Sequence, residues 1–200
     1  MRLSLKHTNI YFTSDHHFHY ANIIKFCHRP FQTVEEMDEE LIKRWNEVVP
    51  KGGIVFHLGD LLMTANLDYL RLLVSRLNGT IHLVYGNHDY QNRLDREVAK
   101  QVFGYRGYDV VELTVFDNKE PQGHISLFMS HYPHLFWHSG SYHLHGHVHG
   151  GPISTANEVV PFHPLRYDVG VDNNDFYPIS YNQLIEIYEQ RKINCRPDLR

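Results

Sequence analysis

Five short apolar segments of this chain each end in Gly or Ser and are followed by side chains that bind divalent metals in other proteins. The segments cover residues 10–14, 54–59, 81–86, 125–130 and 142–146. The side chains that follow them are Asp15, His17, Asp60, Asn87, His131, His147 and His149. Imidazole suits Zn, Fe, Ni and Cu, and carboxylate and amide oxygens complete a mixed ligand set. The sequence therefore predicts metal-dependent chemistry.

These side chains can act together only if the fold brings the ends of the five segments to one place. Runs of five or six apolar, partly β-branched residues indicate buried strands. In open α/β sheets, ligands bind outside the carboxyl ends of the strands. We therefore expect the five strand ends to converge on one edge of a layered fold and to form one site.

Amphipathic helices are expected between the strands. Thr33 and Glu36 have the form of a capping box, and apolar residues then recur at three- and four-residue spacing over 34–48. A second apolar stripe covers residues 67–77 and ends at Asn78 and Gly79, which predicts a C-cap.

The second half of the chain has a different pattern. A third helix is expected over 93–103, and residues 108–116 and 125–130 are two extended runs joined by a polar turn, which predicts a β-hairpin. Ser180 and Gln183 cap a last helix. The order is β-α-β-α-β-α, then antiparallel strands and a terminal helix. This order favours helices on both sides of a sheet-rich core.

Composition limits the classes of function. At 200 residues the chain, 1–200, is expected to form a single domain. The net charge of −4 offers no basic excess for binding long nucleic acids. Cys27 and Cys195 are far apart in the sequence, so neither a disulfide framework nor a thiolate zinc site is predicted. No apolar run has the length of a signal peptide or a membrane span, and we expect a cytoplasmic protein without a membrane partner.

The motifs together resemble those of the calcineurin-like metallophosphoesterase superfamily. Its pattern of D-x-H, G-D, G-N-H-D, H and G-H-x-H occurs here in the same order between residues 10 and 149. Residues 18–31 are similar to a subgroup of small prokaryotic and phage-type members. The resemblance implies a four-layer α/β/β/α sandwich, in which two mixed sheets pack face to face and are flanked by helices.

The resemblance also implies two divalent metal ions. One ion would be held by Asp15, His17, Asp60 and His149, and the other by Asp60, Asn87, His131 and His147, so that Asp60 bridges them. A hydroxide that bridges the ions would attack the phosphorus. His88 would protonate the leaving oxygen or stabilise the transition state, and Asp89 could hold the tautomer of His88. The ligand types do not distinguish among Mn, Fe, Ni, Co and Zn as the bound metals.

Substrate contacts are expected beside this centre. Asn22 and Arg29 could contact phosphate, although Arg29 could equally cap the helix before it. An aromatic wall for a base could be formed by Tyr132, His134, Trp137 and His138, with Trp137 as a packing residue in the alternative. His16 and His145 adjoin predicted ligands and could support them, whereas the remaining histidines are expected to be packed or exposed.

The predicted function is hydrolysis of a phosphodiester on a small, nucleotide-like substrate. Protein Ser/Thr phosphatases of the superfamily have arginines in the G-D and G-N-H motifs, where this chain has Thr64 and Tyr85. A phosphomonoesterase or pyrophosphohydrolase is the alternative among enzymes. A non-catalytic metal-binding scaffold is the alternative of another class, and the intact ligand set with His88 favours the enzyme. The sequence does not indicate the oligomeric state.

Overall fold

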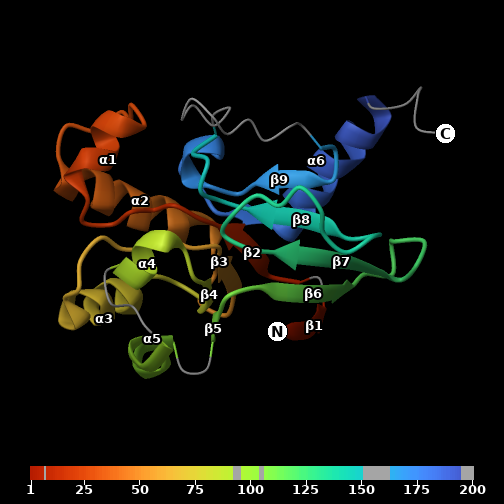
Figure 1. The fold of residues 1–200 in the computed structure, drawn as a ribbon, viewed down its shortest axis with the longest axis horizontal. Helices are drawn as coiled ribbons and strands as arrows, with labels where there is room; N and C mark the ends of the chain where they lie inside the picture. The colour runs from red at the N-terminus through yellow and green to blue at the C-terminus, as the bar shows by residue number, and fades with distance from the viewer. Residues whose placement is uncertain (7, 92–95, 104–105, 151–162, 195–200) are drawn as a thin grey trace.

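Two five-stranded sheets form the centre of the protein in a computed structural model, which describes residues 1–6, 8–91, 96–103, 106–150 and 163–194 (Figure 1). The strand order is β10-β2-β3-β4-β5 in the first sheet and β1-β6-β7-β8-β9 in the second. The protein thus has a mixed α/β fold with two mixed sheets flanked by helices. The expected four-layer order, with helices outside both sheets, stays a prediction.

The first sheet contains the three strands that precede the predicted ligands of the first half of the chain. Its strands are β2 (Ile10–Thr13), β3 (Ile54–His57), β4 (Thr80–Val84), β5 (Gly107–Tyr108) and β10 (Ile179–Ser180). Strands β2 to β5 are parallel, and the short β10 pairs antiparallel with β2 at one edge. The carboxyl ends of β2, β3 and β4 therefore lie at the same edge of this sheet.

The second sheet contains the predicted hairpin. Its strands are β1 (Arg2–Lys6), β6 (Val111–Phe116), β7 (His124–Met129), β8 (Tyr142–His145) and β9 (Arg166–Asp168). Strands β6 and β7 pair antiparallel, which confirms the hairpin, and β7, β8 and β9 are parallel. Strands β1, β5, β9 and β10 were not predicted; the last three have only two or three residues, too few for a periodic pattern.

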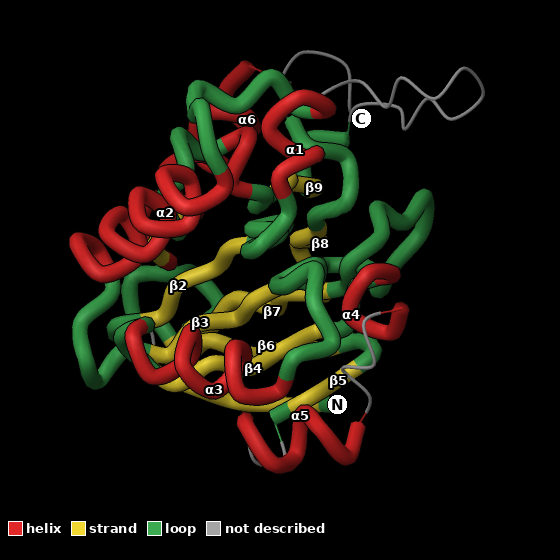
Figure 2. The backbone as a smooth tube through the Cα atoms, turned by 90° about the vertical axis from the view of Figure 1, so that its left-hand side faces the viewer, coloured by secondary structure: helices red, strands yellow, loops and turns green. Residues whose placement is uncertain are grey.

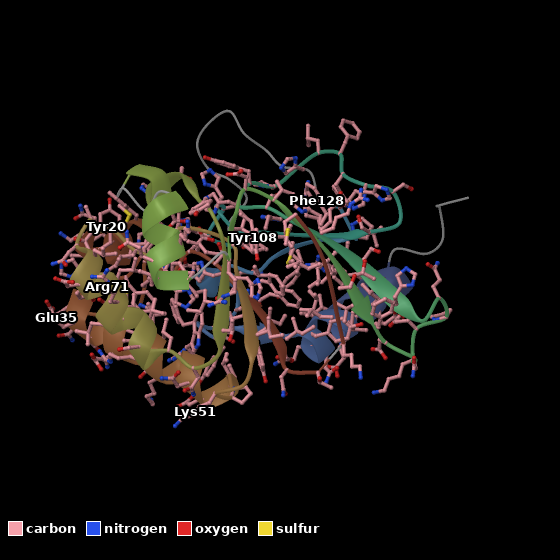
Figure 3. The ribbon with its side chains drawn as sticks, turned by 90° about the horizontal axis from the view of Figure 1, so that it is seen from below. Tyr20, Glu35, Lys51, Arg71, Tyr108 and Phe128 are labelled. Atoms are coloured by element: carbon pink, nitrogen blue, oxygen red, sulfur yellow. The ribbon has the colours of Figure 1, made fainter. Side chains whose placement is uncertain are left out.

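Helices cover the face of the first sheet that points away from the second. They are α1 (Ala21–Phe26), α2 (Val34–Val48), α3 (Leu67–Arg76) and α5 (Arg96–Phe103). Figures 1 and 2 show α2 and α3 on the same side of β2 to β4. The three predicted helices in this part are confirmed, except that residues 93–95 of the third lie outside the described residues. In Figure 3, Tyr20 on the helix side and Phe128 on the second sheet lie far apart.

Capping residues explain where these helices begin. The Thr33 hydroxyl accepts a hydrogen bond from the N–H of Glu36 at 3.1 Å, and the Glu36 carboxylate accepts one from the N–H of Gln32 at 2.8 Å. The capping box is thus present, with Gln32 as the second donor. Asn66 caps α3 by accepting from the N–H groups of Asp68 and Tyr69. Such caps contribute about 1 kcal/mol each.

Of two further helices, the structure adds the first and confirms the second, which is the predicted last helix. The single-turn helix α4 (Asn87–Gln91) begins at a predicted ligand, and α6 (Tyr181–Asn194) begins at the predicted Ser180 cap. Side chains of α6 pack into the core between the two sheets. None of the helices among the described residues is long and apolar enough to cross a membrane.

Two apolar cores hold the strand ends in place. Trp45 and Leu41 of α2 pack with Val55 of the first sheet in the core on the helix side. Phe56 and Leu127 belong to the core between the sheets. All five side chains are buried, and each contributes roughly 1.5–3 kcal/mol by removal from water. This packing leaves the residues just beyond the strands little freedom to move.

Candidate metal centre

The strand ends of the two sheets meet, as the sequence predicts. The His131 Nδ1 atom lies 2.8 Å from the carbonyl oxygen of Leu58, which follows β3. The backbone N–H of His147, after β8, donates to Asp15 Oδ2, after β2, at 3.0 Å. These contacts join the carboxyl ends of β2 and β3 to those of β7 and β8. All seven predicted ligands lie in this region.

The predicted ligands form two groups that resemble two cation sites. In the first group, ligand atoms of Asp15, His17 and His149 lie within 4.8 Å of one another. The second group contains Asp60, His131 and His147 with the same spacing. Each group combines a carboxylate with two imidazoles, so the structure has two His/Asp clusters that could bind metal ions.

Asp60 lies between the two groups. Its Oδ2 atom is 3.6 Å from His17 Nε2 and 3.5 Å from His131 Nε2. Its Oδ1 atom accepts a hydrogen bond from the backbone N–H of His88 at 2.9 Å, which fixes the plane of the carboxylate. The Asp60 carboxylate is thus close to a histidine of each group.

Some buried polar atoms of the predicted ligands have no hydrogen-bond partner in the described part of the chain, and a bound cation would take the place of such a partner. Among the described residues, the buried Asp15 Oδ1 atom and both ring nitrogens of His17 have no hydrogen-bond partner. Burying a polar group without a partner costs about 1–3 kcal/mol. Residues of a folded core rarely tolerate three such atoms together, and a bound metal ion would satisfy the Asp15 oxygen and one of the two His17 nitrogens.

The tautomer of His131 also indicates a site for a metal ion. Its Nδ1 can only donate to the Leu58 carbonyl, so its Nε2 carries a free lone pair. That lone pair faces two more acceptors, Asn87 Oδ1 at 3.0 Å and Asp60 Oδ2 at 3.5 Å. His147 Nδ1 also lies 3.2 Å from this lone pair, so a cation among these atoms would be held by nitrogen and oxygen ligands together. The residues therefore fit a metal ion at this point.

Five of the seven predicted ligands have left-handed backbone conformations. The φ angles are 60° at Asp15, 52° at His17, 56° at Asp60, 73° at His147 and 51° at His149. Residues other than glycine seldom adopt positive φ, and clusters of such residues are typical of functional sites, where the surrounding structure compensates the strain. The sharp turns aim consecutive side chains into the space between the strand ends.

Glycines in the motifs allow the loops to approach one another. A Cβ atom on Gly59, whose φ is +99°, would lie 2.6 Å from the backbone nitrogen of Gly86. A Cβ atom on Gly86 would collide with the Asp60 carboxylate, and one on Gly146 with the Asp15 carboxylate. The glycines of the G-D, G-N-H-D and G-H-x-H motifs are thus required by close packing at the site.

Asp89 does not have the predicted role. Its buried carboxylate accepts hydrogen bonds from the backbone N–H groups of Asp60, Leu61 and Gly86 at 2.8, 3.0 and 2.8 Å. It ties the loop after β3 to the loop after β4, and the prediction that it holds the tautomer of His88 is therefore replaced by this positioning role. Burial and the nearby Asp60 charge raise the pKa of Asp89 to about 7.

His88 lies at the open side of the site. Its Nε2 atom is 4.0 Å from Asp60 Oδ2, and about a third of its side chain is exposed. Its ring meets the His17 ring edge to face at 5.3 Å. A molecule that enters the centre could reach this imidazole.

Arg29 and Asp172 form a buried ion pair that supports the site and that the sequence does not predict. The Arg29 guanidinium donates to both Asp172 oxygens at 2.7 and 2.8 Å and to the carbonyl oxygens of Asp15 and His16. Asp172 in turn lies 2.7 Å from His149 Nδ1. Both predicted roles of Arg29, phosphate contact and helix cap, are corrected by these contacts. A signal for Asp172 existed, because the run 167–169 is followed by Gly170 and, two residues later, by Asp172.

The imidazoles of the site differ in their protonation. Burial lowers the pKa of His17 well below its usual value and that of His147 to about 4. Burial also acts to lower the pKa of His149, but hydrogen bonds with Asp172 and Cys27 and the charge of Asp15 raise it to about 11. His17 and His147 are thus neutral near pH 7, whereas a metal must displace a proton from His149.

Of the predicted aromatic wall, Tyr132 lies at the site. Its hydroxyl group is 3.4 Å from Asn87 Oδ1, its ring packs against His147 at 4.6 Å, and 48% of the residue is exposed. Trp137 instead donates its indole N–H to the Ser141 carbonyl and packs on His143. The alternative of Trp137 as a packing residue is therefore correct.

The other predicted neighbours are placed as follows. His134 is held by its backbone N–H, which donates to the His143 ring, and His138 is exposed. Asn22 is exposed on α1, and its contact with phosphate stays a prediction. His16 lies 2.9 Å from the His57 ring in the helix-side core, away from the predicted ligands, and His145 is bonded to the Gly146 carbonyl.

Relatives of the chain come from an archaeon and a phage. No protein-family model matches it. It is 34% identical over 188 residues to "Uncharacterized protein MJ1445" of Methanocaldococcus jannaschii, which covers 92% of this chain and 93% of that protein. It is 26% identical over 185 residues to the gene 66 protein of Mycobacterium phage L5, covering 82% and 87%. The solved structure of AQ665 from Aquifex aeolicus, a protein of unknown function, has the same fold, with a TM-score of 0.63, 20% identity, and coverage of 89% of this chain and 98% of that one.

Proposed function

The chain belongs to the family of the archaeal protein MJ1445, and we propose that it is a two-metal phosphoester hydrolase of the calcineurin-like metallophosphoesterase superfamily, with the four-layer sandwich of that superfamily. The single observation that carries the proposal is the position of Asp60 between two His/Asp groups at converging strand ends. One ion would be held by Asp15, His17, Asp60 and His149, and the other by Asp60, Asn87, His131 and His147.

Two ions held by these residues would lower the pKa of a shared water and would polarise the phosphoryl oxygens. The protein's own groups hold the ligands in place. The Leu58 carbonyl directs the lone pair of His131 inward, and Asp172 does the same for His149 Nε2 by pairing with its Nδ1. Such supporting contacts fix both the tautomer and the orientation of a metal-binding imidazole. Asp89 holds the loop that carries Asp60.

His88 is the proposed proton donor to the leaving oxygen. It is partly exposed, and its backbone N–H is anchored to the Asp60 carboxylate. The ring is therefore positioned by the same carboxylate that lies between the two groups. A positioned acid of this kind contributes about 10²- to 10⁴-fold to the rate.

We propose a phosphodiester as the substrate class, on a small, nucleotide-like molecule rather than a long nucleic acid. A monoester dianion is commonly held by an arginine, whose planar fork pairs with two phosphate oxygens. The arginine that the sequence offered for this, Arg29, has its guanidinium on Asp172 and two carbonyl groups. Tyr132 offers an exposed aromatic surface beside the second ligand group, where an ester group could lie.

The test is a comparison of bis-p-nitrophenyl phosphate with p-nitrophenyl phosphate, each with Mn, Ni and Zn at one pH. We expect metal-dependent hydrolysis and a higher kcat/KM for the diester. A higher kcat/KM for the monoester would favour the alternative of a phosphomonoesterase, and pyrophosphate substrates test the pyrophosphohydrolase. Binding of two ions without hydrolysis of any of these substrates would favour the non-catalytic scaffold.

A further inference from the structure

A thiol lies beside one of the predicted metal ligands. Cys27 follows α1, is half-buried, and is held by its backbone N–H, which donates to the Ile23 carbonyl at 2.9 Å. Ligand atoms of Cys27, His149 and Asp172 all lie within 4.8 Å of one another. This cluster, which we call the thiol cluster, shares His149 with the proposed catalytic centre.

We propose that the thiol cluster is a separate site for a thiophilic divalent cation, such as Zn²⁺ or Cd²⁺, and that an ion bound there competes with the catalytic centre for His149. The competition rests on the proposed function, whereas the binding does not. A thiolate, an imidazole and a carboxylate are a usual zinc ligand set, and a water would complete the tetrahedron. Cys27 would bind as the thiolate and His149 through a deprotonated Nδ1, with both protons released to solvent.

The surroundings of the cluster suit such an ion. Asp172 is held rigidly by two hydrogen bonds from Arg29, so its carboxylate needs no ordering when an ion binds. The thiolate, the carboxylate and the Arg29 guanidinium together carry one negative charge. A divalent ion would therefore leave the cluster with a net charge of only +1. The contact of 2.7 Å between His149 Nδ1 and Asp172 Oδ2 must open to roughly 3.3–3.7 Å, the separation of two ligands on one tetrahedral ion.

Binding at the cluster would disturb the first ligand group. His149 Nδ1 would point to the new ion and would lose its hydrogen bond with Asp172. That hydrogen bond is what directs His149 Nε2 toward Asp15 and His17. Mn²⁺ has little affinity for thiolates, whereas Zn²⁺ binds nitrogen and sulfur ligands more tightly. An excess of Zn²⁺ should therefore inhibit the Mn-loaded protein.

Cadmium is the probe for the site, because a Cd²⁺–thiolate bond has a charge-transfer absorption in the ultraviolet. The full chain is first loaded with Mn²⁺ and then titrated with Cd²⁺, as wild type, Cys27→Ser and Cys195→Ser. Cys195 lies outside the described residues and serves as the matched control. We expect the band in wild type and in Cys195→Ser, at about one equivalent per chain, and its loss in Cys27→Ser. A band that persists in Cys27→Ser, or is lost in Cys195→Ser, would overturn the proposal.

Two further measurements separate the site from the proposed function. In Cys195→Ser, Zn²⁺ should slow alkylation of Cys27 by iodoacetamide, whereas the same excess of Mn²⁺ should not; equal rates with both ions would count against the site. Inhibition of diester hydrolysis by excess Zn²⁺, normalised to the Mn-dependent rate of each variant, should weaken in Cys27→Ser. If no variant hydrolyses the diester but the band follows Cys27, the proposed function fails and the cation site stands.

Discussion

The guanidinium of Arg29 binds the carboxylate of Asp172 through two hydrogen bonds of 2.7 and 2.8 Å, and both side chains are almost fully buried. Asp172 also pairs with His149, so a cation from the first quarter of the chain positions a predicted metal ligand more than a hundred residues away. This arrangement makes Arg29 part of the support of the site. It also removes a positive charge that a substrate dianion would need.

Asp172→Asn should weaken binding of one metal ion by about 10- to 100-fold, the usual cost of losing a residue that supports a metal-binding imidazole. The reason is that Asn cannot accept from both Arg29 and His149 as a carboxylate does. Calorimetric titration with Mn²⁺ measures the change. Asp68→Asn is the control, because Asp68 is exposed at the start of α3. Equal Mn²⁺ affinity in the two variants would contradict the supporting role.

Asp60→Ala should abolish hydrolysis and lose more metal than any other single substitution. Asp60 is the only side chain assigned to both ions, so its removal affects both sites. Asn87→Ala is the matched comparison, because Asn87 is assigned to one ion and should leave the other bound. Elemental analysis of the two purified variants gives the metal content per chain. Two ions per chain with near-normal turnover in Asp60→Ala would show that the assignment is wrong.

His88→Ala should keep both metal ions but lower kcat about 10²- to 10⁴-fold. The loss should be smaller for p-nitrophenyl esters than for alkyl esters, because p-nitrophenolate leaves without a proton. Single-turnover rates with the two classes of ester measure this difference. If both classes lost the same factor, His88 would be a phosphate contact and not the acid.

Tyr132→Ala should lower kcat/KM for an aryl diester by about 5- to 150-fold, which corresponds to the usual value of about 1–3 kcal/mol for stacking on an aromatic side chain. Tyr132→Phe should retain most of the activity, because the ring provides the stacking surface. Trp137→Ala serves as the contrast, since that indole packs within its loop and on His143 and should affect stability more than kcat/KM. A loss of the same size in Tyr132→Phe would assign the effect to the hydroxyl group instead.

Asp38→Asn should change the pH dependence of stability. Burial raises the pKa of Asp38 to about 6, although its carboxylate accepts hydrogen bonds from the Tyr69 hydroxyl and the His19 backbone N–H. The folded state therefore binds this proton more tightly than the unfolded chain does. The stabilisation is fully present below about pH 4 and is lost as the pH rises through about 6.

Asn cannot ionise and mimics the protonated acid. The variant should match the metal-free wild type at pH 4 and exceed its free energy of unfolding by about 1–3 kcal/mol at pH 7. Urea denaturation of both proteins in EDTA at the two pH values checks this, because the other titrating groups cancel in the difference. A difference between the two proteins that is the same at both pH values would contradict the prediction.

Local patterns in the sequence were sufficient to predict the main strands, the hairpin, the principal helices and the residues gathered at the strand ends. An apolar run, a glycine and a metal-binding side chain are neighbours in the chain, as are Thr33 and Glu36 of the helix cap. Parallel strands then bring their carboxyl ends to one edge of a sheet. The convergence of Asp15, Asp60 and His147 follows from these local rules together with the topology.

Only the tertiary structure decided how the supporting residues are paired. Arg29 and Asp172 are 143 positions apart, and Asp89 contacts the backbone of a loop 28 and 29 positions away. Nothing local distinguishes an arginine that will bind phosphate from one that will bind a buried carboxylate. The choice depends on which acceptors the packed strands and α1 leave within reach. The same reason explains why Tyr132, and not Trp137, lies beside the metal centre.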